Sequence, residues 1–225
     1  MKRTVTVFLV LLISLGQSCT RSKNEATPAP VEKPRESIAM EKEDGRSIIV
    51  AVGDSLTEGH GVDENQNYPS KLQRRLDSAG YKYRVINAGI SGETSAQGLD
   101  RIEPVLALHP AIVIVELGAN DGLRGLPIET TRRNLAAAVS RCQSAGARVV
   151  VAGMEMPPNY GPQYTSAFRN VFKNVANEYH AALIPFFLEG VGGHPELNQD
   201  DGIHPTAEGY DRVVENVWKV LKPLL

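Results

Sequence analysis

Short apolar runs alternate with amphipathic segments along most of the chain. Five runs rich in Val, Ile and Leu predict buried parallel strands, because strands covered on both faces lack polar alternation. These strands are expected at Ser47–Val52, Arg84–Asn87, Ala111–Leu117, Arg148–Gly153 and Leu183–Phe186. Five segments with apolar residues three or four positions apart predict helices at Pro69–Ala79, Ala96–Leu108, Ile128–Ala145, Gln163–Tyr179 and Thr206–Leu221. Pro104 is expected to kink the second of these helices or to start a new one.

The order of these segments predicts the fold class. Strands that alternate with helices favour right-handed crossovers and a parallel sheet covered on both faces. We therefore expect an α/β protein, a three-layer α/β/α sandwich with a five-stranded parallel sheet. Open sheets of this kind place their functional residues just beyond the carboxyl ends of the strands. The sequence shows no internal repeat and no second domain.

The N-terminus has the order of residues that is typical of an export signal. Lys2 and Arg3 precede the apolar stretch Val5–Leu15, and small or polar residues lead from there to Cys19. A positive start, an apolar core of about ten residues and small residues afterwards predict a secretory signal over residues 1–19. A buried N-terminal strand or helix is the alternative.

Cys19 leaves two kinds of processing open. A Cys just after the apolar stretch, followed by polar residues, resembles a bacterial lipoprotein signal, which implies lipidation of Cys19 and membrane attachment. Gly16 stands where such signals usually have Leu, so ordinary cleavage nearby fits as well. Either way the domain is expected to be exported, as a periplasmic protein or an anchored lipoprotein. Cys142 is then left alone, and no intrachain disulfide is expected.

Residues 20–46 predict a disordered tether. They hold three prolines, many charges and few large apolar side chains. Such a segment cannot bury enough apolar surface to offset the entropy lost on ordering. A short helix around Ser37–Glu43 is the alternative. The remaining residues, 47–225, are expected to form one domain.

Composition and charge exclude several classes of protein. The 225 residues suit one globular domain, and a formal net charge of −2 gives no basic field for nucleic acid. Two cysteines exclude a disulfide scaffold and a four-thiolate zinc site. The five histidines, His60, His109, His180, His194 and His204, include no pair four positions apart. We therefore expect no metal and no cofactor. We also expect a monomer that acts on a small molecule.

The first motif with chemical content is Gly53-Asp54-Ser55-Leu56, directly after the first strand. A serine at a tight strand-to-helix turn can present its hydroxyl to solvent while its own N–H points into the same space. Gly53 lets the chain turn without a Cβ clash. An Asp/Ser turn or helix cap is the alternative, since the G-x-S-x-G pattern is absent.

A second motif, Asp201-Gly202-Ile203-His204-Pro205, precedes the last helix. An Asp three residues before a His can accept a hydrogen bond from Nδ1 and fix the tautomer, which leaves Nε2 to take a proton from a hydroxyl. A capping or surface histidine is the alternative for the motif alone.

Two further motifs follow the third and second strands. In Gly118-Ala119-Asn120-Asp121, the Asn120 amide could donate to an oxyanion while Asp121 holds the loop, although a plain Asx turn is the alternative. Asn87–Thr94 is a glycine-containing loop with free N–H groups, which could also cradle phosphate. Because neither G-x-x-x-x-G-K-[ST] nor G-x-G-x-x-G occurs, nucleotide binding is not expected.

These four motifs, in this order and at these strand ends, resemble the SGNH hydrolases, the GDSL-type esterases and lipases. The stretches NAGISGETSAQGL, ELGANDGLRG, PPNYGPQY, IPFF and QDDGIHP are most similar to the bacterial branch of multifunctional thioesterases, lysophospholipases and arylesterases. The similarity runs from about Ile48 to the C-terminus and implies the flavodoxin-like fold of that family.

The resemblance also implies roles for individual residues. Ser55 would be the nucleophile, His204 the general base and Asp201 the acid that orients it. The oxyanion hole would consist of the N–H groups of Ser55 and Gly92 and the side chain of Asn120. From their positions alone, the wall around the acyl chain is expected to include Leu123, Leu126, Met156, Pro157 and Tyr160.

The expected activity is hydrolysis of carboxylic esters or thioesters through an acyl-enzyme, without a cofactor. Aryl esters, short or medium acyl esters, acyl thioesters and lysophospholipids are the substrate classes that the resemblance implies. A carbohydrate O-deacetylase of the same fold is the alternative, and it would have a shallow polar cleft. A non-catalytic envelope-binding protein is a more remote alternative.

Overall fold

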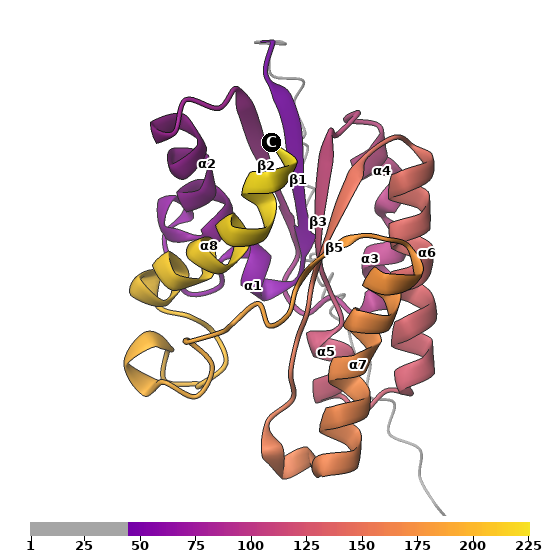
Figure 1. Cartoon of the computed structure of the whole chain (residues 1–225). Coiled ribbons are helices and arrows are strands. Elements are labelled where there is room, and N and C mark those ends of the chain that lie inside the picture. The colour runs from indigo at the N-terminus through magenta and orange to yellow at the C-terminus, as the bar shows by residue number, and fades with distance from the viewer. Residues whose placement is uncertain (1–44) are drawn as a thin grey trace, which may run out of the picture. The chain divides into compact units, whose positions relative to one another are not determined.

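A computed structural model describes residues 45–225 of the chain. The expected signal at 1–19 and residues 20–44 of the expected tether lie outside the described residues. Within them, five strands form one parallel sheet in the order β2-β1-β3-β4-β5 (Figure 1). This confirms the predicted α/β fold, and the strand order is that of flavodoxin-like sheets.

The strands have nearly the predicted bounds: β1 is Ser47–Gly53, β2 Tyr83–Gly89, β3 Ile112–Glu116, β4 Arg148–Ala152 and β5 Ala182–Ile184. All five residues of β3, the central strand, are buried, which explains its apolar run from Ile112 to Val115; Glu116 ends the strand. In the register of the sheet, Gly53 pairs with both Gly89 and Glu116. The carboxyl ends of β1, β2 and β3 therefore coincide, and the loops that follow them start side by side.

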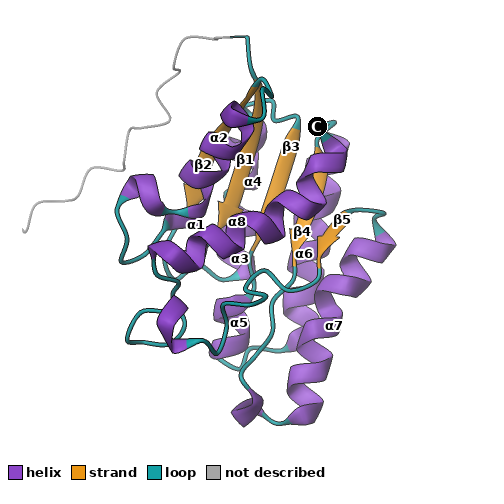
Figure 2. Ribbon diagram, turned by 60° about the vertical axis from the view of Figure 1, so that its left-hand side comes forward, coloured by secondary structure: helices purple, strands orange, loops and turns teal. Residues whose placement is uncertain are grey.

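Helices cover both faces of the sheet (Figure 2). One face carries α2 (Tyr68–Ser78) and α8 (Ala207–Leu221), which pack on each other. The other face carries α3 (Ser95–Asp100), α4 (Ile102–Leu106), α6 (Ile128–Ser144) and α7 (Pro162–Glu178). Two short helices at the carboxyl edge, α1 (Ser55–Glu58) and α5 (Ala119–Leu123), have no counterpart among the predicted helices. Four 3₁₀ turns occupy Glu64–Gln66, Pro158–Tyr160, Pro195–Leu197 and Lys222–Leu224.

The predicted helix Ala96–Leu108 is two helices that meet at Arg101. Pro104 falls in the first turn of the second helix, where its missing N–H costs no hydrogen bond. The break turns the Arg101 side chain toward the carboxyl edge, where it pairs with Glu93 at 2.6 Å and donates to the Gly53 carbonyl oxygen at 3.1 Å. The interruption thus ties together the loops that follow β1 and β2.

One continuous core of buried apolar side chains extends over both faces of the sheet. Its largest fully buried members are Tyr68, Tyr210, Phe168, Phe172 and Phe187. Among residues 45–225, no helix is long and apolar enough to cross a membrane.

Candidate active site

Ser55 lies where β1 turns into α1. A Cβ on Gly53 would come within 2.0 Å of Thr57 Oγ1 and 2.5 Å of Glu116 Oε2, so only glycine fits this turn. Asp54 caps α1, because its Oδ1 accepts a hydrogen bond from Leu56 N at 3.0 Å. The turn thus fixes Ser55 as the first residue of α1, at the carboxyl edge of the sheet.

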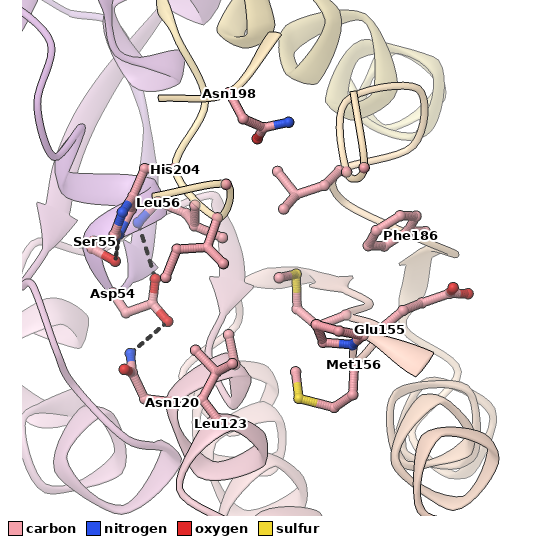
Figure 3. Close-up of a pocket in the computed structure, with 18 of the residues that line it drawn as sticks. Asp54, Ser55, Leu56, Asn120, Leu123, Glu155, Met156, Phe186, Asn198 and His204 are labelled. Atoms are coloured by element: carbon pink, nitrogen blue, oxygen red, sulfur yellow. Dashed lines mark hydrogen bonds between the residues drawn. The ribbon is translucent and has the colours of Figure 1, made fainter. Parts of the chain in front are cut away.

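His204 reaches Ser55 from the loop before α8. Its Nε2 lies 2.9 Å from Ser55 Oγ, and its Nδ1 lies 2.7 Å from Asp201 Oδ2 (Figure 3). The second carboxylate oxygen, Asp201 Oδ1, accepts from the N–H groups of Ile203 and His204 at 2.9 and 3.0 Å. The chain between the two side chains is therefore a closed turn, and the expected Ser–His–Asp arrangement is assembled.

Asp201 is held in its ionised form. Partial burial would raise the pKa of this carboxyl, but the hydrogen bonds from His204 and from the N–H groups of Ile203 and His204 together lower it to about 2. A carboxylate at Nδ1 keeps the proton of a neutral imidazole on that nitrogen and leaves Nε2 free to accept one.

The expected oxyanion donors lie beside Ser55. Gly92 has a left-handed backbone (φ 79°) in the loop after β2, and its carbonyl oxygen accepts from Arg124 Nη2 at 2.8 Å. Asn120, in α5, donates from Nδ2 to Asp54 Oδ2 and to the Glu93 carbonyl oxygen, both at 3.0 Å. Ser55, Gly92 and Asn120 all line the same cavity.

Asp121 holds α5, the helix that also carries its neighbour Asn120, in place. Its carboxylate accepts from Ser95 N at 2.7 Å, from the Ser95 hydroxyl and from Thr131 Oγ1 at 3.2 Å. These bonds join α5 to α3 and α6. The loop-holding role that the sequence suggested for this aspartate agrees with these contacts.

Two buried carboxyl groups lie beneath the nucleophile turn. Asp54 and Glu116 are 1% and 0% exposed, and Glu116 Oε2 accepts from Asp54 N at 3.3 Å and from Thr57 Oγ1 at 2.8 Å. Burial raises the pKa of Asp54 to about 6, and burial together with the Asp54 charge raises the pKa of Glu116 well above its usual range. Glu116 was not among the predicted site residues, although an acidic residue in the most apolar strand was a visible signal.

A cavity of about 580 Å³ opens next to Ser55, within the range of small-molecule sites. Ser55, His204 and Asn120 lie at one side of it, and mainly apolar side chains, with Glu155 and Asn198 among them, form the rest of its wall (Figure 3). The apolar members of the wall are Leu56, Ala119, Leu123, Met154, Met156, Pro157, Pro158, Phe186, Leu188 and Ile203. Glu155 also lines the cavity, and it pairs with Arg169 at 3.5 Å.

Of the five wall residues expected from the sequence, Leu123, Met156 and Pro157 line this cavity. Leu126 and Tyr160 do not. Tyr160 instead donates from its hydroxyl to the Leu123 carbonyl oxygen at 3.1 Å, so it supports the wall from behind. Met154, Phe186 and Leu188 were not predicted. They follow β4 and β5, and functional residues are expected just beyond the carboxyl ends of these strands too.

No group of three or more His, Cys, Asp or Glu side chains in the described part of the chain is arranged to hold a metal ion. His194 pairs with Glu196 at 3.4 Å in an exposed loop. Cys142 is buried, and its burial raises the pKa of the thiol to about 12, so it is not a reactive thiolate.

Comparison with known proteins gives consistent matches. Residues 51–212 match the GDSL-like Lipase/Acylhydrolase family. Esterase TesA of Pseudomonas aeruginosa is 46% identical over 84% of this chain and 94% of its own. Thioesterase 1/protease 1/lysophospholipase L1 of Escherichia coli is 37% identical over 79% of this chain and 84% of its own. A crystal structure of TesA superposes with a TM-score of 0.78 at 48% identity, covering 80% of this chain and all of that one.

The chain therefore belongs to the GDSL-like lipase and acylhydrolase family, the SGNH hydrolases. It is a serine hydrolase that acts on ester bonds.

Proposed function

We propose that Ser55, His204 and Asp201 are the catalytic triad of an esterase that cleaves carboxylic esters and thioesters with an apolar acyl chain. The observation that carries this proposal is the position of the His204 ring between Ser55 Oγ and Asp201 Oδ2, at 2.9 and 2.7 Å. That contact joins residues 149 positions apart in the chain, at the mouth of an apolar cavity. A histidine that only caps a helix or lies on the surface is not expected to contact both a serine hydroxyl and a carboxylate.

In this mechanism His204 Nε2 takes the proton of the Ser55 hydroxyl as Oγ attacks the acyl carbon. The tetrahedral intermediate then collapses: the bond to the leaving oxygen or sulfur breaks, and His204 gives its proton to that atom. An acyl-enzyme on Ser55 remains. Water attacks it with His204 again as the base, and this step releases the acid and restores the serine.

The N–H groups of Ser55 and Gly92 and the Asn120 amide would hold the oxyanion. Loss of one such donor typically costs about 3–4 kcal/mol of transition-state stabilisation. The Ser55 N–H is suited to this, because the first N–H groups of a helix have no acceptor within the helix. Arg124 and Glu93 support the proposal by fixing the Gly92 loop and the Asn120 amide from behind.

The cavity supports an acyl chain as the part of the substrate that is bound. Ten apolar side chains line it, two of them methionines, whose unbranched thioethers adapt to chains of different length. A carbohydrate deacetylase needs a small acetyl site and many polar partners for a sugar, whereas outside the proposed catalytic residues and Asp54 the polar side chains of this lining are Ser91, Glu155 and Asn198. The names of the relatives, an esterase and a thioesterase with lysophospholipase activity, support the same substrate classes.

The test is hydrolysis by the purified protein of nitrophenyl esters and acyl thioesters from acetyl to palmitoyl, with Ser55→Ala alongside. We expect kcat/KM to rise from acetyl to medium chains, and the variant to lose activity by several orders of magnitude while it melts like the wild type. A serine-reactive phosphonate should label Ser55. Strict acetyl specificity would favour the deacetylase, and no hydrolysis of any ester would favour a binding protein.

We further propose that the domain is exported. The order of charged, apolar and small residues over 1–19 supports an export signal. Lipidation of Cys19 is one of two ways in which that signal could be processed, and the fractionation experiment described in the Discussion separates them.

A further inference from the structure

A second histidine lies against the base of the proposed triad. The ring centroids of His60 and His204 are 4.6 Å apart, with the ring planes tilted by 45°. His60 follows α1 in the chain and is exposed, whereas the His204 side chain is only 14% exposed. The two histidines come from segments far apart in the sequence, so the contact is a tertiary one.

The two segments are also clamped together by Gln199. Its Nε2 donates to the carbonyl oxygens of His60 at 2.7 Å and of Pro205 at 3.0 Å. Its backbone N–H donates to the carbonyl oxygen of His204 at 2.8 Å. Gly61 has φ 75°, and a Cβ there would come within 2.0 Å of Gln199 Oε1. The glycine thus makes room for the clamp, and the clamp holds the His60 segment in register with the His204 loop.

We propose that His60 is a positioning residue for His204. This inference rests on the proposed function, in which His204 is the general base. The His60 ring adds a contact to the His204 ring besides its hydrogen bonds to Ser55 and Asp201. His204 becomes a cation in the transition state, and a neutral aromatic ring tolerates that charge.

The experiment compares the wild type with His60→Phe, which keeps an aromatic ring at this position, and His60→Ala, which removes the ring. The kcat and KM for a soluble nitrophenyl ester are measured at pH 8.5. His180→Asn is the matched control, because His180 is exposed, has φ 50°, which Asn tolerates, and precedes β5 at the opposite edge of the sheet. Thermal melting of each variant checks the fold.

At pH 8.5 we expect His60→Phe to stay within about twofold of the wild type, and His60→Ala to lose about fivefold in kcat with little change in KM. The His180→Asn variant should keep the wild-type kcat. A His60→Ala variant equal to the wild type, or a His60→Phe variant as slow as His60→Ala, overturns the inference. Failure of the proposed function itself would be distinct: His204→Ala would then keep full activity.

Discussion

Asn120 donates from Nδ2 to the buried carboxylate of Asp54 across 3.0 Å, and the same nitrogen donates to the Glu93 carbonyl oxygen at an equal distance. Both hydrogens of the amide are thus oriented before any substrate binds. To stabilise an oxyanion, Asn120 must share one of these hydrogens with the substrate oxygen. The partner that holds the amide, Asp54, is also the residue that caps the nucleophile helix, so one carboxylate aligns two parts of the proposed site.

Replacement of Asn120 by alanine is expected to lower kcat by about 10²–10³ with a smaller change in KM, because the donor acts mainly on charge that develops in the transition state. Steady-state kinetics on a medium-chain nitrophenyl ester measures both constants. An effect confined to KM would instead make Asn120 a residue that binds the substrate in its ground state.

Asp54→Asn is expected to lower kcat by about tenfold. The new amide can still cap α1 through its oxygen, but its NH₂ group would face the NH₂ group of Asn120, and two donors cannot bond. Because the two residues act as a unit, the double variant Asp54→Asn/Asn120→Ala should be no slower than Asn120→Ala alone. Additive losses would show that Asp54 acts independently of Asn120.

The sequence predicted the sheet, the long helices and the Ser55–His204–Asp201 arrangement because each has a local signal. Buried strands appear as apolar runs, and the motifs follow them at the carboxyl edge. The helices α1 and α5 were not predicted, since four or five residues are too few to show a helical period. Yet these two turns present Ser55 and Asn120.

The new helix around Pro104 was predicted, but the partners of Arg101 and of Asn120 depend on tertiary contacts, which no local pattern encodes. Arg101 lies between two helices, where its side chain contacts Glu93 and the carbonyl oxygen of Gly53. Leu126 and Met156 looked equivalent in the sequence, since both follow strands. Only the packing of the loops decides that Met156 lines the cavity and Leu126 does not.

Glu116→Gln is expected to make stability less dependent on pH. Because burial raises the pKa of Glu116 in the folded state, the native protein keeps a proton there at pH values where the unfolded chain, with a pKa near 4.3, has lost it. The free energy of unfolding of the wild type should therefore fall as the pH rises above that value, by about 1.4 kcal/mol for each pH unit over which only the native state is protonated.

Glutamine has no such proton, so the stability of the variant relative to the wild type should increase from pH 5 to pH 8. Denaturant unfolding at both pH values measures this difference. Burial raises the pKa of Asp54 too, and because Asp54 and Glu116 act on each other the comparison reports on the pair of carboxyl groups. A difference that stays constant with pH would mean that Glu116 is ionised in the native state at pH 5 as well as at pH 8.

Met156→Ser is expected to reduce the preference for octanoyl over acetyl esters by about tenfold, because a buried thioether chain contributes on the order of 1.5 kcal/mol of apolar contact. Leu126→Ser is the matched control, as it comes from the same set of sequence-predicted wall residues but lies outside the cavity. The ratio of kcat/KM for the two esters is the readout. An equal loss in both variants would place the acyl chain elsewhere.

The last prediction concerns the location of the enzyme, and it depends on residues 1–46, of which only 45 and 46 are described. Export is expected for both the wild type and any variant that keeps the apolar stretch Val5–Leu15. If the 27 residues from 20 to 46 behave as a flexible chain, they span roughly 30 Å, enough for the cavity to meet membrane lipids or soluble esters. Fractionation of cells that express the wild type or Cys19→Ala measures where the activity goes. Wild-type activity in the membrane pellet, with the variant released or unprocessed, would establish lipidation, and activity of both in the periplasm would establish ordinary cleavage. Activity confined to the cytoplasm would contradict export.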